Sequence, residues 1–157
     1  GLEFRRDQQI RTGDNVTDFM KELVKADRVA VFVGPEYLKS ENCCWELYHL
    51  WKNCRMDEIE FKRRAIPIVD NDAELHSPEA REKIEEYWED QFKKVNRARR
   101  QAVKNDRSFD DKRWRWLNEF RNQVWEILNA LNDPLIDRDF DKLAETDFKE
   151  LWPLFEV

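Results

Sequence analysis

The chain has 157 residues, of which 39% are charged and 41% hydrophobic, with 7 Trp and 10 Phe. This size and this content of aromatic residues exclude a disordered chain and a disulfide-stapled mini-protein, so we expect one folded domain over residues 1–157. The net charge of −6 gives no general attraction to nucleic acid, no apolar run approaches the roughly 20 residues of a membrane helix, and the first residues do not have the pattern of a secretory leader. A cytoplasmic protein with no nucleic-acid and no membrane partner is predicted.

The cysteines and histidines do not form a recognisable metal or catalytic pattern. Cys43, Cys44 and Cys54 are odd in number and close in sequence, which is typical of reduced thiols rather than of a disulfide framework. The two histidines, His49 and His76, lack the repeated spacing that tetrahedral zinc requires. We therefore expect no metal site and no Ser-His-Asp catalysis.

The N-terminal segment reads as a strand, a loop and a short helix. Leu2 to Phe4 alternates as the end of a strand would, and the polar stretch from Arg5 to Asp14 is typical of a loop with Gly13 at its tightest point. Apolar residues then recur at helical spacing between Val16 and Val24. This pattern predicts an amphipathic helix that stops near residue 26.

Two continuous apolar runs predict strands buried on both faces. The first is Val29–Val33, bounded by Gly34-Pro35, and the second is Ala65–Val69, in which Pro67 is awkward for a central position. Between them, Ser40 or Asn42 can cap a helix. Its apolar stripe consists of Cys44, Leu47, Tyr48, Trp51 and, at its end, Cys54.

The order β-α-β-α-β predicts a parallel sheet with helices on both faces, where ligands gather beyond the carboxyl ends of the strands. The second half of the chain is rich in predicted helix. Residues 77–100 form a highly charged helix, whose basic run 93–100 we interpret as a solvated face rather than a nucleic-acid patch. One long helix with an apolar stripe from Trp114 to Leu131 follows, and a terminal helix is expected over Phe140 to Trp152.

One carboxylate lies where chemistry is expected. Glu46 falls in the first turns of the helix after the Val29–Val33 strand, and its position is off the apolar stripe, so its side chain can point toward a cleft. A carboxylate there can stabilise an oxocarbenium-like cation at a ribose carbon. A glutamate near a helix N-terminus is also favoured by the helix dipole, so spacing alone leaves a purely structural role open.

These residues resemble the central block of Toll/interleukin-1 receptor (TIR) domains, particularly bacterial ones. The resemblance covers nearly the whole chain. Upstream, Asp7 and Gly13 bracket a segment similar to the family's BB loop; downstream, the strand ending at Val69, the helices around Trp88 and Trp125, and Asp147-Phe148 resemble the rest of bacterial examples. It implies a flavodoxin-like parallel sheet flanked by helices. The matching central residues are Asp27 to Val33, Tyr37 to Ser40, Cys43, and Glu46-Leu47.

The resemblance implies an activity, because many TIR domains cleave NAD+ at the nicotinamide-ribose bond with a glutamate at the position of Glu46. Ser40, Asn42 and Cys43 would then flank the substrate pocket, and the loop from Asp7 to Gly13 would lie beside it. NAD+ would be the substrate, and no metal or other cofactor is implied. Family members commonly act through homo-oligomers formed by TIR-TIR contacts, in bacterial immune or stress signalling.

Three departures from the family pattern favour the alternative of a non-catalytic interaction module. Asn42 stands where the family often places an aromatic residue that stacks on the bound base, and Trp45 is rotated about 100° away from that position. Gly34 replaces the serine that commonly ends the third strand. The first strand and helix of the family are not recognisable before Leu2, so the chain looks N-terminally truncated, with a gap in the sheet between the strand ending at Phe4 and Val29–Val33.

Overall fold

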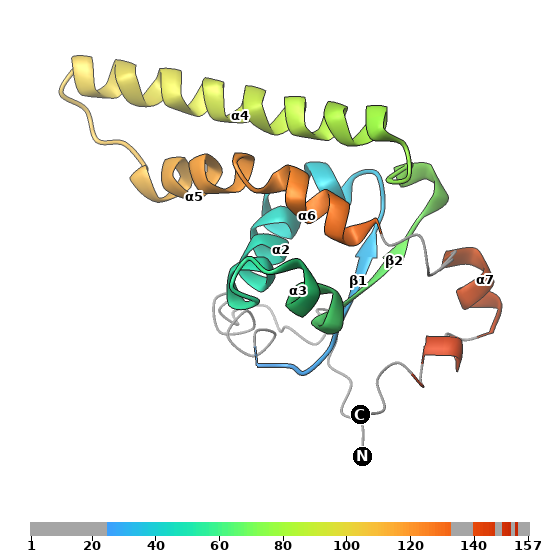
Figure 1. Cartoon of the computed structure of the whole chain (residues 1–157). Helices are drawn as coiled ribbons and strands as arrows, with labels where there is room; N and C mark the ends of the chain where they lie inside the picture. The colour runs from blue at the N-terminus through green and yellow to red at the C-terminus, as the bar shows by residue number, and fades with distance from the viewer. Residues whose placement is uncertain (1–24, 133–139, 147–148, 152, 154–157) are drawn as a thin grey trace, which may run out of the picture.

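The computed structural model describes residues 25–132, 140–146, 149–151 and 153 (Figure 1). The strand expected at Leu2 to Phe4, the loop from Asp7 to Gly13 and the helix expected between Val16 and Val24 lie outside the described residues. A short parallel sheet, with helices packed against it, forms the centre of the described fold.

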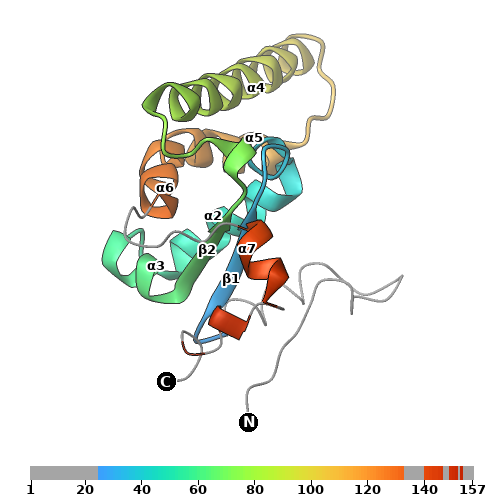
Figure 2. The ribbon, with the colours of Figure 1, turned by 90° about the vertical axis from the view of Figure 1, so that its right-hand side faces the viewer.

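The two predicted strands are confirmed. β1 (Val29–Val33) and β2 (Ala65–Val69) run parallel, with Val29 opposite Ala65 and Val33 opposite Val69. On one face of β1, Val31 and Val33 are buried in the main core. The other face of β1 is less buried than predicted. Ala30 packs against the small apolar cluster to which α7 and η4 contribute (Figure 2), whereas Phe32 is 46% exposed.

Pro67 is accommodated because its nitrogen points away from β1. The backbone N–H of Asp70 donates to the carbonyl of Val33 at 2.9 Å. Successive residues of a strand present their backbone N–H groups to opposite sides. The N–H groups of Ile66 and Ile68 therefore point toward β1, and the nitrogen of Pro67 points to the other side. The missing N–H of proline therefore costs the β1–β2 ladder nothing.

The helix after β1 forms as predicted, and a further helix follows it. α2 (Glu41–Asn53) is capped by Ser40, and the five residues of the predicted stripe are all buried. α3 (Glu58–Arg64) was not predicted. Arg55 and Met56 adopt positive φ angles of 57° and end the α2 segment, and Asp57 then caps α3 by accepting from the N–H of Glu60.

The C-terminal half is helical, but the long helix expected from residue 114 to residue 131 is divided. α4 (Pro78–Lys104) is followed by α5 (Asp111–Arg121) and α6 (Val124–Leu131), separated at Asn122 and Gln123. The Gln123 side chain accepts the indole N–H of Trp51 at 3.1 Å, so this break coincides with a tie to α2. The apolar stripe continues through both helices, as Leu117, Phe120, Val124, Ile127, Leu128 and Leu131 are buried.

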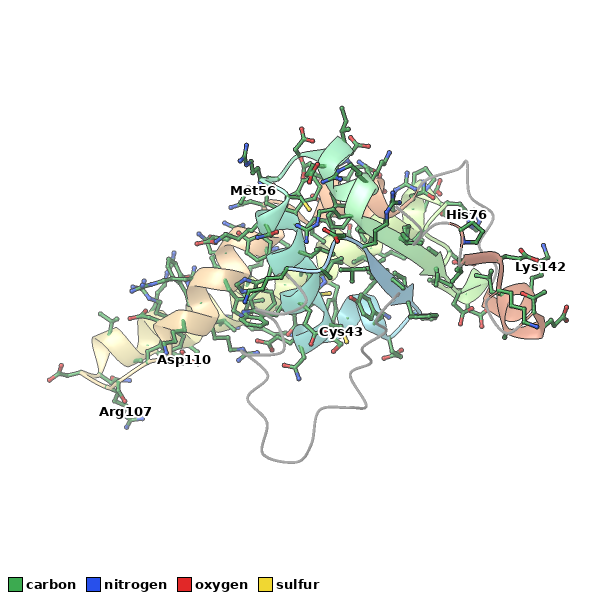
Figure 3. All side chains as sticks on the ribbon, turned by 90° about the horizontal axis from the view of Figure 1, so that it is seen from below. Cys43, Met56, His76, Arg107, Asp110 and Lys142 are labelled. Atoms are coloured by element: carbon green, nitrogen blue, oxygen red, sulfur yellow. The ribbon has the colours of Figure 1, made fainter. Side chains whose placement is uncertain are left out.

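The chain ends with short elements. α7 (Phe140–Glu145) and η4 (Lys149–Leu151) occupy part of the expected terminal helix, and Thr146 lies between them. α4 and α5 form an antiparallel hairpin that projects from the sheet (Figure 1). Its turn, marked by Arg107 and Asp110, lies at the opposite end of the molecule from His76 and Lys142 (Figure 3).

Trp88 joins this helical half to the sheet. Its ring packs edge-on against Phe120 at a centroid distance of 5.1 Å, and its indole N–H donates to the carbonyl of Leu38 at 2.9 Å. Both Trp88 and Leu38 are almost fully buried, with exposures of 2% and 1%. One side chain on α4 thus fixes the loop that follows β1.

Trp88→Phe tests this anchor. The change removes a buried hydrogen bond and part of a packed ring, and we expect it to lower the free energy of unfolding by about 2 kcal/mol. Urea unfolding followed by circular dichroism measures the difference. Trp116→Phe, in a half-buried ring of the same aromatic cluster, is the matched control, and an equal loss in both variants would contradict the role of the Leu38 bond.

Candidate functional site

The loop between β1 and α2 is held rigidly at the carboxyl end of β1. The N–H of Tyr37 donates to the carbonyl of Gly34 at 3.1 Å, and residues Tyr37–Lys39 form the 3-10 helix η2. Besides the Trp88 bond, the carbonyl of Leu38 accepts the thiol of Cys44 at 3.3 Å. The loop therefore presents Ser40, the start of α2, in one defined position.

Ser40 and Cys43 are hydrogen-bonded to each other at the N-terminus of α2. The Ser40 hydroxyl accepts the backbone N–H of Cys43 at 3.4 Å, which satisfies one of the free N–H groups of the first helical turn. The Cys43 side chain is half-buried and lies at this end of α2 (Figure 3), whereas Asn42 is exposed. Of the predicted pocket residues, Ser40 thus has a clear structural task as a helix cap.

Glu46 lies one turn further along α2, on the flank between the buried stripe and the exposed side. It is half-buried, and its negative charge is the smallest of the four causes that raise the pKa of the Tyr37 phenol. Burial is the largest cause of the shift, followed by the neighbouring Cys44 and Cys43 thiols. Tyr37 therefore remains a neutral hydroxyl at physiological pH.

Tyr37 is a site residue that the sequence analysis did not select. Its position in the strand-to-helix loop was a possible signal, since loops at the carboxyl ends of parallel strands commonly carry binding groups. Sequence spacing, however, does not show that the charge of Glu46, nine positions further along the chain, acts on this phenol.

Trp45 does not occupy the place of the aromatic residue that the family pattern expects. Its ring lies against the imidazole of His49, with centroids 4.1 Å apart. Partial burial, with a smaller contribution from Lys52, lowers the pKa of His49, so this imidazole is mostly neutral at pH 7. Trp45 and His49 thus pair one helical turn apart on α2.

The structure thus brings Ser40, Cys43 and Glu46 together over the first turns of one helix, with Asn42 exposed nearby. Asp7 and Gly13, the two predicted binding residues of the preceding loop, lie outside the described residues. The described part of the site offers a carboxylate, a thiol and a neutral phenol at the carboxyl edge of the sheet.

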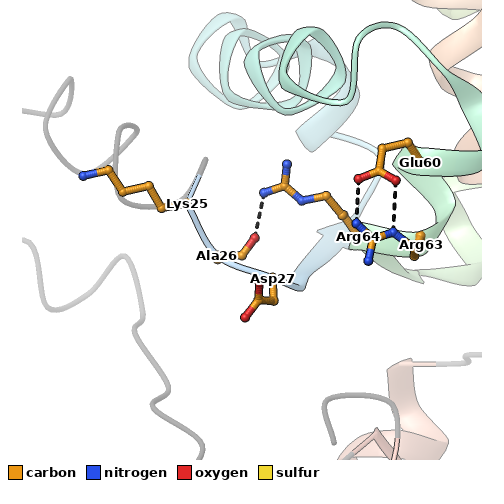
Figure 4. Close-up of a pocket in the computed structure, with 6 residues that line it drawn as sticks. All are labelled: Lys25, Ala26, Asp27, Glu60, Arg63 and Arg64. Atoms are coloured by element: carbon orange, nitrogen blue, oxygen red, sulfur yellow. Dashed lines mark hydrogen bonds and ion pairs between the residues drawn. The ribbon is translucent and has the colours of Figure 1, made fainter. Parts of the chain in front are cut away.

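A polar recess of about 250 Å³ lies at the opposite end of β1 (Figure 4). Its charges are largely matched: Arg63 binds Glu60 through two hydrogen bonds of 3.0 and 2.7 Å, and Arg64 donates to the carbonyl of Ala26 at 2.6 Å. Arg64 also bonds to Asn53 on α2. This recess therefore fixes the entry of the chain into β1 and is separate from the site around Glu46.

In the described part of the chain, no cluster of three or more His, Cys, Asp or Glu side chains could hold a metal ion. Among the same residues, no helix is both long and apolar enough to cross a bilayer.

A parallel α/β domain with a polar group at the carboxyl edge of its sheet is a common architecture for signalling and nucleotide-binding modules. The particular family is given by a family model described as TIR domain, which matches residues 1–105. The chain belongs to the TIR domain family. Neither the curated proteins nor the solved structures contain a significant match.

The matched region ends at Asn105, the residue that caps the C-terminus of α4. α5 and α6 lie beyond it, yet their residues Phe120 and Ile127 share one core with Val33 and Trp51. The prediction of a single domain over residues 1–157 stays a prediction, and the shared core is the observation in its favour.

Thiol labelling tests the geometry of the site. Burial raises the pKa of Cys44 and of Cys54, so both thiols stay protonated and shielded, whereas Cys43 is partly accessible. In folded protein at pH 7.5 we expect iodoacetamide to modify Cys43 first. Peptide mass spectrometry reads the order, urea-unfolded protein provides the control with all three thiols modified, and early labelling of Cys44 would contradict the described packing.

Proposed function

We propose that this TIR domain is an NAD+ nucleosidase that cleaves the nicotinamide-ribose bond, with Glu46 as its catalytic residue. The observation that carries the proposal is the placement of Glu46: half-buried, at the carboxyl edge of a parallel sheet, in a Ser40-x-x-Cys43-x-x-Glu46 pattern. This pattern resembles the one in which TIR enzymes hold their catalytic glutamate.

The chemistry requires little more than a well-placed carboxylate. The bond between the ribose anomeric carbon and the nicotinamide nitrogen breaks, and its electron pair neutralises the positive nicotinamide ring as it leaves. The ribose is left with oxocarbenium character, which the negative charge of Glu46 stabilises. Water, or a nucleophilic atom of the adenine-bearing product itself, then attacks the anomeric carbon; with water, a proton is released and ADP-ribose is formed.

The neighbouring groups have supporting roles in this proposal. Ser40 caps α2 and thereby fixes the helical turn that carries Glu46, and the Cys43 side chain lines the approach to it. The neutral Tyr37 hydroxyl, in the loop before α2, can donate a hydrogen bond. Asp7, Gly13 and Asn42 complete the proposed pocket, NAD+ is the substrate, and the reaction needs no metal or other cofactor.

We further propose that the domain is a cytoplasmic component of bacterial immune or stress signalling that becomes active on self-association. A second candidate function is a non-catalytic TIR interaction module. The observation that favours it is the exposed Asn42 at the position where TIR enzymes often have a stacking aromatic residue. Loss of that stack weakens substrate binding by roughly 1 kcal/mol and leaves the carboxylate chemistry in place, so the enzyme remains the first proposal.

Glu46→Gln provides the direct test. The amide has nearly the same shape but no charge, so we expect NAD+ cleavage to fall by about 100-fold or more. Release of nicotinamide and of the adenine product, separated by chromatography, measures turnover at protein concentrations that drive self-association. The product identity also distinguishes hydrolysis from cyclisation.

The matched control is Glu126→Gln, which makes the same chemical change at an exposed position on α6. It should retain the turnover of the unmodified protein. Absence of turnover in the unmodified protein, or equal turnover in Glu46→Gln, would reject the nucleosidase and leave the interaction module.

A further inference from the structure

The long helix α4 has opposite charges in its two halves. Residues 78–90 contain six acidic and two basic side chains, whereas residues 91–104 contain six basic and no acidic ones. The helix has 27 residues and is therefore about 40 Å long, so these charges are well separated. The protein as a whole is acidic, which makes the basic half an exception in its composition.

The separation of acidic and basic side chains is clearest on the outward side of α4. An exposed stripe, which we call the α4 stripe, runs along the side opposite the buried residues Ile84, Trp88 and Phe92. Its residues follow one another at intervals of three or four. The α4 stripe consists of Glu79, Lys83, Glu86, Asp90, Lys93, Arg97, Gln101 and Lys104.

The inner side of α4 is already occupied by α5. Arg121 of α5 binds Glu89 at 2.7 Å, Asp111 binds Arg99 at 2.9 Å, and Trp114 donates to Asn96 at 3.1 Å. Figures 1 and 2 both place α4 at the periphery, with no other described element over its outer side. Within the described part of the chain, the α4 stripe is therefore left to solvent.

We propose that the α4 stripe is a surface through which two copies of this chain pair, with the two helices antiparallel. A two-fold axis near residues 91 and 92 places the acidic half of each helix against the basic half of the other. A helix whose charge changes sign at its centre is complementary to itself in this orientation and repels itself in the parallel one.

The antiparallel register matches individual residues. Glu79 lies opposite Lys104 of the second copy, Glu86 opposite its Arg97, and Asp90 opposite its Lys93. The symmetry repeats each of these contacts. Asp90 and Lys93 already form an exposed ion pair of 3.4 Å within one helix, so the axis would bring four alternating charges together.

Lys83 is the exception: the register places it opposite Arg100 of the second copy, within one position of the neutral Gln101, and this like-charge contact weakens the pairing. A surface of this kind binds weakly: exposed ion pairs contribute little individually and are screened by salt. The pairing is therefore expected at high local concentration and at low ionic strength. The pairing provides a surface for the self-association that the proposed function requires. Only its role in activating the enzyme rests on the proposed function; the pairing itself does not.

Charge reversal on the α4 stripe tests the pairing in the 157-residue chain. Glu86→Arg and Arg97→Glu each convert two attractive contacts into two repulsive ones, so each should raise the dissociation constant of the dimer by about tenfold or more. Sedimentation equilibrium at 50 and 500 mM NaCl measures this, and the unmodified protein should dissociate at the higher salt.

Restoring association by combining the two reversed charges is the decisive experiment. An equimolar mixture of Glu86→Arg protein and Arg97→Glu protein should associate again, because each reversed residue meets a reversed partner. The double variant Glu86→Arg/Arg97→Glu should also self-associate, to within about threefold of the unmodified protein. Neither result is explained by misfolding, since a misfolded variant has no reason to recover on mixing.

Controls of equal charge lie off the α4 stripe. Lys112→Glu at the start of α5 and Glu126→Arg on α6 alter net charge by the same amounts as the two test variants and should leave association unchanged. Unmodified protein that stays monomeric at 1 mM in low salt, or single reversals that associate normally, would overturn the proposal.

A nucleic-acid partner would give a different pattern. Arg97→Glu would then weaken binding of a labelled single-stranded oligonucleotide, Glu86→Arg would strengthen it, and mixing the two would restore nothing; this outcome also overturns the proposal. Association is measured without NAD+, so failure of the pairing and failure of Glu46 as the catalytic residue are distinguished by separate experiments.

Discussion

The hydrogen bond from the Trp88 indole to the Leu38 carbonyl connects the two halves of this protein. It joins a helix in the middle of the chain to the loop after β1, over 50 positions of sequence, inside a buried aromatic cluster. The loop in turn fixes Ser40, the cap of α2, and α2 carries Glu46. The geometry of the candidate site thus depends on a residue that has no contact with the proposed substrate.

The same helix has two independent tasks. Its inner side supplies Trp88 and Phe92 to the core. It also binds α5, through the ion pair with Arg121 of α5 and through its own Arg99. Its outer side carries the α4 stripe, which no other described element covers. Acidic residues at the N-terminus and basic residues at the C-terminus of a helix also suit the helix dipole, but that effect is confined to the first and last turns. The segregation of charge extends over the whole length of α4, and antiparallel pairing gives each sign its complement.

Much of the local structure was predictable because it follows from short-range patterns. Both strands, the capped helix after β1 and the charged helix from Pro78 were expected from apolar period and capping residues. α3 was missed, since seven residues with few apolar positions carry little periodic signal. The break at Asn122 and Gln123 was missed because the apolar stripe continues across it, whereas the bond between Gln123 and Trp51 joins segments far apart in sequence.

The sequence by itself determined the class of the protein, the strand-loop-helix unit that holds Ser40, Cys43 and Glu46, and the opposite charges of the two halves of α4. Each of these depends on neighbours in sequence. Tertiary structure alone decided that the carbonyl of Leu38 accepts the indole N–H of Trp88, that Gln123 binds Trp51, and that one charged side of α4 stays exposed. These are contacts or exposures set by packing between separate elements, and local propensity carries no information on them.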